Sequence, residues 1–440
     1  MTSVVQLFSR TCWRSPDSLA QTIAELVDRV EERDRAIQAF LPEPHRRERL
    51  LAEVDDLNRA YPASTRAHDN ARPALFGVPV GIKDLFHVDG FETRAGGALP
   101  ADLFAGAEAS VVTRLREQGA LIFGKTVATE FAFAEPGPTR NPHNLQHTPG
   151  GSSSGSAAAV ATGFVPLTLG TQTIGSVARP ASFCGVVGFK PSYGRIPADG
   201  CVPFSVSVDH VGFFTPDIAS VETVAAALVP DWNHKAADED PPHTGIGWIT
   251  GPYWEQCEPE MKTLLTEQVD QLTALGANVQ SIDLFPDWQE WVDLHYDLIA
   301  AEFAEFHAPW FEHYRDLYRP RTIELIERGQ TIPAQRIEIA QASRLTLRKR
   351  VMDAMKEHGI SRWITPSAIG PAPAGLDSTG SPLMNLPWSY TGLPTVTMPS
   401  GNTKAGLPLG IQWVGSYGQD EMLVRQCCGE MYEHGLTKMS

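Results

Sequence analysis

A lysine in an apolar segment has the position and the surroundings of a general base. Lys83 lies in the segment GVPVGIKDLF, residues 77–86, where most of its neighbours are valine, isoleucine, leucine or phenylalanine. Lysine side chains are almost never buried without a reason, and burial disfavours their charged form. A lysine buried in this way loses its proton near physiological pH, so it can accept a proton from a nucleophile.

Two loops supply hydroxyl groups for such a base. The first, TPGGSSSGSAAAVATG at 148–163, contains Ser152, and the second, GTQTIGSVARPASFCG at 170–185, contains Ser176. The first loop has the composition of a linker, but it runs into an alanine-rich helix and an apolar strand, which linkers do not do. It is not a phosphate-binding loop of the Walker type, because no lysine follows Gly155. A catalytic role for both loops is the interpretation that remains.

Taken together, these three segments resemble the amidase signature family. Lys83, Ser152 and Ser176 follow one another in the family's order, with steps of 69 and 24 residues. The resemblance implies an α/β fold, with a large mixed β-sheet core flanked on both sides by helices, and an enzyme that hydrolyses amide carbon–nitrogen bonds. It covers the chain from about residue 70 to the C-terminus, including TRNPHN (139–144), GFKPSYGRIP (188–197), NLPWSYTGLPTVTMPSG (385–401) and LPLGIQWVG (407–415).

The resemblance also assigns the catalytic roles. Ser176 is expected to be the nucleophile and neutral Lys83 the base. Ser152, which usually follows a cis peptide bond in this family, would carry the proton between them. For this role the pKa of Lys83 must lie at about 7–8, and desolvation would lower it to that range. Asp84 would oppose this shift if it faced Lys83, but neighbours in an extended segment point to opposite faces.

The second loop is expected to stabilise the oxyanion through its backbone. The N–H groups of Thr173, Ile174, Gly175 and Ser176 would bind the substrate oxygen, and small residues there let the backbone approach it closely.

This chain departs from the family pattern at three positions. Gln172 stands where the family usually has aspartate, and Ile174 stands where it usually has glycine. Ala178 replaces a common arginine and Arg179 follows it, so the role of Arg179 remains open. We expect Phe133, Gln172 and Ile174 to line the substrate pocket. The alternative for Ile174 is that its side chain packs backwards into the core.

Other candidate sites are weaker. The aromatic run 291–318 has helical spacing, so it forms either core or pocket lining. The histidines show no metal-binding pattern, and we expect no metal and no cofactor. The six cysteines include no C-x-x-C pair, which indicates free thiols in a reducing compartment.

Composition and charge restrict the partners. The formal net charge is −16, which argues against nucleic acid and against anionic membrane surfaces as partners. No apolar run approaches the length of a membrane-spanning helix, and the first residues show no secretory signal. We therefore expect a cytoplasmic protein, monomeric or homodimeric, that acts on a small-molecule amide.

The order of the elements predicts one domain. Helix and strand patterns alternate through about residue 230, which is typical of an α/β sandwich. We expect a single amidase signature domain over residues 1–440, with N-terminal helices at 1–70 and a catalytic core at 71–230. A variable, mostly helical part would follow at 231–357, and 358–440 would complete the core.

Three functions are compatible with these residues. The first is a free-standing hydrolase of amides, in which carbamates, ureides or esters are possible substrates because the acyl chemistry is the same. The second is the glutaminase subunit of a tRNA-dependent amidotransferase, which works in a complex. The third is a silent scaffold, against which the intact set of Lys83, Ser152 and Ser176 argues.

Overall fold

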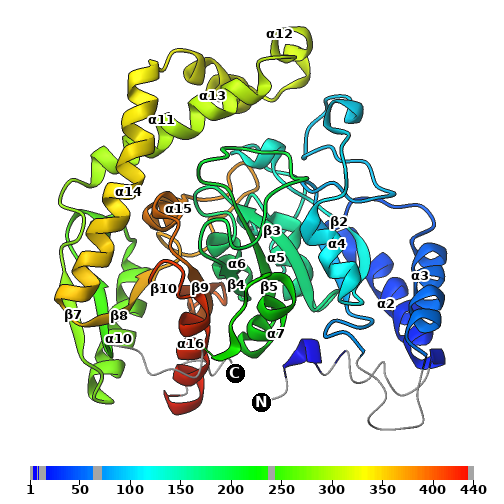
Figure 1. Ribbon diagram of the computed structural model, residues 1–440, viewed down its shortest axis with the longest axis horizontal. Helices are drawn as coiled ribbons and strands as arrows, with labels where there is room; N and C mark the ends of the chain where they lie inside the picture. Colours follow the sequence, from blue (N-terminus) through cyan, green and yellow to red (C-terminus); the bar gives the residue numbers. More distant parts are fainter. Residues whose placement is uncertain (1–2, 7, 9–15, 63–71, 236–242, 435–440) are drawn as a thin grey trace.

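A ten-stranded mixed β-sheet forms the centre of the molecule (Figure 1). The computed structural model describes residues 3–6, 8, 16–62, 72–235 and 243–434. The strand order is β2-β1-β3-β5-β4-β9-β10-β8-β6-β7, with both parallel and antiparallel neighbours. The strands are β1 Pro79–Lys83, β2 Leu121–Thr126, β3 Leu167–Gln172, β4 Val187–Lys190, β5 His210–Thr215, β6 Gly245–Ile249, β7 Val279–Ile282, β8 Ile360–Pro366, β9 Thr395–Asn402 and β10 Pro408–Gly415.

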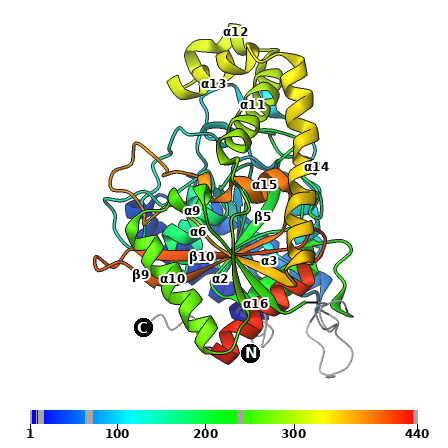
Figure 2. The ribbon, with the colours of Figure 1, turned by 90° about the vertical axis from the view of Figure 1, so that its left-hand side faces the viewer.

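Helices cover both faces of this sheet (Figures 1 and 2), so the expected α/β architecture is confirmed. None of the helices in the described part of the chain has both the length and the apolar character needed to cross a bilayer. The α-helices are α2 Pro16–Ile37, α3 Arg46–Ala60, α4 Ser110–Glu117, α5 Ser154–Ala161, α6 Ala178–Cys184, α7 Ile218–Leu228, α9 Pro252–Glu255, α10 Pro259–Ala274, α11 Trp288–His307, α12 Phe311–Tyr314, α13 Pro320–Gln330, α14 Ala334–Glu357, α15 Leu386–Thr391 and α16 Asp420–His434.

The strands that carry the site are buried on both sides. Every residue of β1, β2 and β3 is buried, which explains why these strands lack the polar alternation of a half-exposed sheet. β1 pairs in parallel with both β2 and β3. The carboxyl ends of β1 and β3 therefore meet at one edge of the sheet, where ligands bind in open α/β folds.

A helical arm formed by α11, α12 and α13 projects from the sheet (Figures 1 and 2). The helices α11 and α13 pack so closely that a side chain at Gly329 would lie 2.0 Å from the carbonyl oxygen of Ala300. The aromatic run 291–318 is not one helix, since α11 ends at His307. Phe303 of this run is fully buried in the core, as one of the two interpretations predicted.

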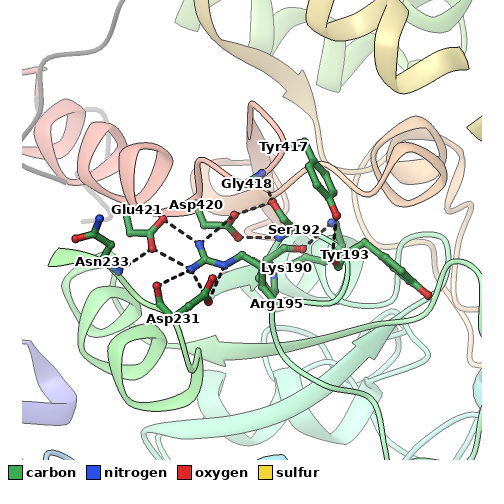
Figure 3. Close-up of polar contacts among 11 residues, drawn as sticks. Lys190, Ser192, Tyr193, Arg195, Asp231, Asn233, Tyr417, Gly418, Asp420 and Glu421 are labelled. Carbon is green, nitrogen blue, oxygen red and sulfur yellow. Dashed lines mark hydrogen bonds and ion pairs between the residues drawn. The ribbon is translucent and has the colours of Figure 1, made fainter. Parts of the chain in front are cut away.

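A polar cluster joins the last helix to the sheet (Figure 3). Arg195 forms ion pairs with Asp231 at 2.8 Å, Glu421 at 2.9 Å and Asp420 at 3.5 Å. Asp420 also accepts hydrogen bonds from the N–H and hydroxyl groups of Ser192. We call these five residues the Arg195 cluster. It fixes the N-terminal turn of α16 against the loop that follows β4.

Candidate active site

Lys83 is the last residue of β1, and its side chain is fully buried. Its Nζ atom lies 2.7 Å from Ser152 Oγ and 2.7 Å from Thr171 Oγ1. Thr171 belongs to β3, the parallel neighbour of β1, whereas Ser152 comes from the loop before α5. The sheet edge therefore brings together two of the predicted residues and one, Thr171, that the sequence analysis missed.

Burial lowers the pKa of Lys83 to about 7, and the negative charge of Asp209 opposes this shift only in part. The adjacent Asp84 does not contribute. It faces away, as predicted, and forms an ion pair of 2.9 Å with the buried Lys125. Among the described residues, Lys83 therefore contacts hydroxyl groups and forms no ion pair with a carboxylate, so its neutral form is accessible at physiological pH.

Each of the three consecutive serines in the serine-rich loop makes a different hydrogen bond. The Ser152 hydroxyl accepts a hydrogen bond from Lys83, and the peptide bond that precedes Ser152 is cis, as the family resemblance implied. Ser153 donates to the carbonyl oxygen of Thr171 at 3.2 Å, and Ser154 donates to that of Gly150 at 2.8 Å. The neighbours of Ser152 thus bind backbone and fix the loop, which leaves the Ser152 hydroxyl directed at the lysine.

One glycine makes this loop possible. A side chain at Gly155 would lie 2.1 Å from the carbonyl oxygen of Ala39 and 2.5 Å from the backbone nitrogen of Val127. Gly155 donates a hydrogen bond to the carbonyl oxygen of Val127 at the same place. The first turn of α5 therefore packs directly on the backbone beyond β2, and only glycine fits there.

Gln172 lies beneath the second loop and holds it in place. Its Oε1 atom accepts hydrogen bonds from the N–H groups of Val177 and Ala178 at 2.8 and 2.9 Å. Its Nε2 atom donates to Ser389 Oγ, and that hydroxyl donates to the carbonyl oxygen of Ile174 at 2.7 Å. We expected Gln172 on the pocket wall, but it is fully buried and is not among the lining residues. An uncharged side chain suits this position, because it must accept and donate at once.

Four backbone N–H groups of the second loop lack a backbone partner among the described residues. Within the described chain, the N–H groups of Thr173, Ile174, Gly175 and Ser176 form no backbone hydrogen bond outside the helices and strands. A side chain at Gly175 would lie 2.7 Å from Asn385 Nδ2, so this position requires glycine. This stretch of unpaired donors is what oxyanion binding needs.

A cavity of about 190 Å³ opens beside Ser176. Phe133 and Ile174 line it, which are two of the three residues expected in the pocket. Ile174 also packs on the main core, so both interpretations of its side chain apply in part. The other lining residues are Ala132, Ala134, Thr173, Arg179, Phe204, Tyr296, Thr379, Gly380 and Pro382.

A second cavity of about 280 Å³ lies next to the first and shares Ala132, Thr173 and Phe204 with it. Thr171, the partner of Lys83, and Asp209 also line it. Burial raises the pKa of Asp209 to about 6, although its carboxylate accepts hydrogen bonds from Thr173 Oγ1 and from two backbone N–H groups. The two cavities are therefore neighbours, and residues of the second loop line both of them.

The placement of the remaining cysteines and histidines decides whether they could act as metal ligands or nucleophiles. Among the residues that the structure describes, no group of three or more His, Cys, Asp or Glu side chains is arranged to hold a metal ion. Cys184, Cys201, Cys257 and Cys428 are in no disulfide, and Cys12 lies outside the described residues. Cys184 is fully buried, and burial raises the pKa of its thiol, so it is not a nucleophile.

The chain is similar to known proteins along most of its length. The family model Amidase matches residues 22–424. Among the relatives are A subunits of glutamyl-tRNA(Gln) amidotransferases, and the one from Geobacter sp. (strain M21) is 30% identical over 458 residues, which cover 92% of each chain. A solved structure described as an amidase superposes with a TM-score of 0.81 at 30% identity and covers 96% of both chains. The peptide amidase PAM in complex with chymostatin gives a TM-score of 0.77 at 25% identity, covering 95% of this chain and 94% of the other.

Proposed function

The chain belongs to the amidase signature family, whose members hydrolyse amide carbon–nitrogen bonds, and on that premise we propose that it cleaves a small-molecule amide through an acyl-enzyme on Ser176. The observation that carries the proposal is the buried Lys83, whose Nζ atom lies 2.7 Å from Ser152 Oγ and forms no ion pair with a carboxylate in the part of the chain that the structure describes. A lysine in these surroundings is a base rather than a fixed positive charge.

The acylation step uses this arrangement as a proton path. Neutral Lys83 accepts the Ser152 proton while Ser152 accepts the proton of Ser176, and Ser176 Oγ forms a bond to the carbonyl carbon. The resulting oxyanion binds the backbone N–H groups of the second loop. The carbon–nitrogen bond then breaks as the proton returns through Ser152 to the leaving nitrogen, which departs as an amine or ammonia.

Deacylation repeats these steps with water in place of Ser176. Water gives its proton through Ser152 to Lys83, its oxygen bonds to the acyl carbon, and Ser176 leaves with the returned proton. This step releases the carboxylic acid and regenerates the Ser176 hydroxyl. The same sequence serves a carbamate, a ureide or an ester, since only the leaving group and the acyl substituent differ.

The curated relatives favour a second candidate, a glutaminase subunit of a tRNA-dependent amidotransferase. Several of them are glutamyl-tRNA(Gln) amidotransferase A subunits, and the Geobacter protein matches along 92% of its length. In that case the chain would be active only in a complex. Gel filtration of the pure chain, followed by an assay of the eluted monomer or homodimer with a panel of amides, carbamates and esters, separates the two candidates.

The central test uses Ser176→Ala. We expect the variant to fold and to lose at least a thousandfold in kcat, about the loss that removal of a serine nucleophile causes elsewhere. A fluorophosphonate should label the wild-type chain at Ser176 and leave the variant unlabelled. Ser400→Ala is the matched control, because within the described chain the Ser400 hydroxyl donates only to the carbonyl of Met398. Residual activity above about a tenth of wild type would refute the assignment.

A further inference from the structure

Arg179 is a buried arginine whose hydrogen-bond partners in the described chain are all uncharged. It lies three residues after Ser176 with 5% of its surface exposed. Its Nη1 atom donates to the carbonyl oxygen of Gly380 at 2.5 Å. Its Nη2 atom donates to the carbonyl oxygen of Gly151 at 2.6 Å and to Thr379 Oγ1 at 3.2 Å. Its buried Nε atom has no hydrogen-bond partner among the described residues.

The lack of an acidic partner is unusual for a cation in this position. A guanidinium has five N–H donors, and three hydrogen bonds leave two of them unused. Burial lowers the pKa of Arg179 to about 10, so the group remains positively charged at neutral pH. Burying a charge without a counter-charge is strongly unfavourable. Arg46 is almost equally buried but forms an ion pair of 3.1 Å with Glu43.

The place of Arg179 suggests where the missing negative charge comes from. Arg179 lines the cavity of about 190 Å³ that also contains Ser176, and none of the described aspartates or glutamates lines this cavity. The hydroxyl-bearing side chains of Tyr296 and Thr379 line it as well, whereas Phe133, Ile174 and Pro382 supply apolar wall. The cavity therefore combines one cation and the hydroxyl groups of Tyr296, Thr379 and Thr173 with an apolar surface, next to the proposed nucleophile.

We infer that the substrate is a small amide whose acyl group carries a carboxylate, and that this carboxylate binds Arg179. The inference rests on the proposed function, because it places the amide carbonyl at Ser176. The planar guanidinium matches a carboxylate in geometry and charge, and such charged hydrogen bonds are strong when solvent is excluded. The volume of the cavity restricts the acyl group to a short chain, as in the monoamides of short dicarboxylic acids.

The first test compares matched substrates of the wild-type enzyme. Succinamate and glutaramate are each paired with the neutral amide in which a methyl ketone replaces the carboxylate. We expect kcat/KM to favour the carboxylate substrate by at least about tenfold, since a buried hydrogen bond to a charged group is worth that much. Equal values, or hydrolysis of the neutral amides alone, would overturn the inference and leave the proposed function intact.

The second test measures binding without catalysis, so that the two ideas fail separately. Succinate and succinamide are titrated calorimetrically into Ser176→Ala, and the dianion should bind at least about tenfold more tightly. Tighter binding of succinate together with an absence of amide hydrolysis in wild type would refute the proposed function but support the anion site. Equal binding would overturn the anion site.

Substitution of the arginine separates recognition from positioning, because Arg179 also holds the carbonyl of Gly151 next to Ser152. In Arg179→Gln, kcat/KM for the carboxylate substrate should fall at least about ten times more than kcat/KM for its neutral partner. Arg46→Gln, a buried arginine outside the cavity, should leave this ratio unchanged. An equal loss for both substrates in Arg179→Gln would assign Arg179 to loop positioning and overturn the inference.

Discussion

Two fully buried lysines, Lys83 and Lys190, occupy different regions of the same sheet. Burial lowers the pKa of each to about 7. Lys83 ends β1 at the edge of the sheet, where it contacts the loop that carries Ser152. Lys190 ends β4 next to the Arg195 cluster (Figure 3). By pKa alone, the two side chains are equally good candidates for a general base.

Their hydrogen-bond partners distinguish them. Lys83 contacts the hydroxyl groups of Ser152 and Thr171, and a hydroxyl group can both accept and donate a proton. Lys190 donates to the carbonyl oxygens of Leu393 and Pro191, at 2.6 and 3.2 Å, and a carbonyl has no proton to give. Lys190 therefore fixes backbone, whereas Lys83 has a path for proton transfer. A lowered pKa identifies a base only when a proton donor is in contact with it.

The arginines of the two regions differ in the same way. Arg195 forms ion pairs with three carboxylates, so its charge is compensated within the protein. Arg179 has only uncharged partners in the described chain and keeps an unpaired Nε atom there. The charge of Arg195 is thus balanced within its cluster, whereas within the described chain the region around Ser176 leaves N–H donors without a partner on the loop backbone and on Arg179. Unused donors in a buried site are what a ligand can complete.

The largest expected effect tests the comparison of the two lysines directly. Lys83→Met should lower kcat/KM by at least a thousandfold, roughly the loss observed when a member of a catalytic triad is removed. Lys190→Met should change kcat/KM by less than about threefold, because it removes only structural hydrogen bonds. Circular dichroism and thermal melting confirm that both variants fold. A comparable loss of activity in the two folded variants would remove the distinction.

The dependence of activity on pH is the next effect in size. Below pH 7, kcat/KM should rise roughly tenfold per pH unit as Lys83 loses its proton, and it should level off above an apparent pKa of about 7. Asp209 also acts on Lys83 through its charge and has a pKa raised to about 6, so Asp209→Asn should lower the apparent pKa by removing a negative charge. Lys190→Met should leave the profile unchanged. If the profile shifts in Lys190→Met, the group that controls activity is Lys190 and not Lys83.

Sequence patterns predicted the α/β fold and singled out the residues of the proposed catalytic set, because both depend on local signals. Lys83 stands out as a charge in a continuous apolar run, and the serine loops stand out by composition and spacing. The strand order was not predictable, because β5 lies between β3 and β4 and β10 lies between β9 and β8. These placements depend on pairing between distant segments, which leaves no periodicity in the sequence.

The supporting contacts of the site were unpredictable for the same reason. Gln172 reaches Ser389 across 217 residues of sequence, and Tyr296 of α11 reaches the cavity from the helical arm. Thr171 is the exception, because it lies directly before Gln172 on the strand that leads to the second loop. Its contact with Lys83 follows once β1 and β3 are known to be parallel neighbours.

The third prediction concerns stability, to which both lysines contribute alike. Their folded-state pKa of about 7 lies below the ordinary lysine value of 10.5, so the unfolded chain binds more protons between these values. The free energy of unfolding should therefore rise with pH from about 7 to about 10, and this contribution is lost as the pH falls through 7. Each substitution, Lys83→Met or Lys190→Met, should reduce the slope by about 1 kcal/mol per pH unit. Urea unfolding at several pH values measures it, and unchanged slopes would contradict the burial of a neutral lysine.

The smallest expected effect isolates the hydroxyl partner that distinguishes Lys83 from Lys190. Thr171→Val removes one of the two hydroxyl groups in contact with Lys83 and keeps the branched shape of the side chain. At pH 8, kcat/KM should fall by about threefold to tenfold, which corresponds to the loss of one hydrogen bond that orients the base. The charged form of Lys83 loses the same acceptor, so the apparent pKa should fall below about 7.

These two consequences oppose each other at low pH, because the variant has more neutral lysine there than wild type. The loss caused by Thr171→Val should therefore be smaller at pH 6 than at pH 8. Thr168→Val is the matched control, since Thr168 lies on the same strand and its hydroxyl donates to the carbonyl oxygen of Ser156. Its kcat/KM should change by the same factor at both pH values. Suppose that Thr171→Val, like Thr168→Val, lowers kcat/KM by the same factor at both pH values. The Thr171 hydroxyl then only supports packing, and the contact with Ser152 alone distinguishes Lys83 from Lys190.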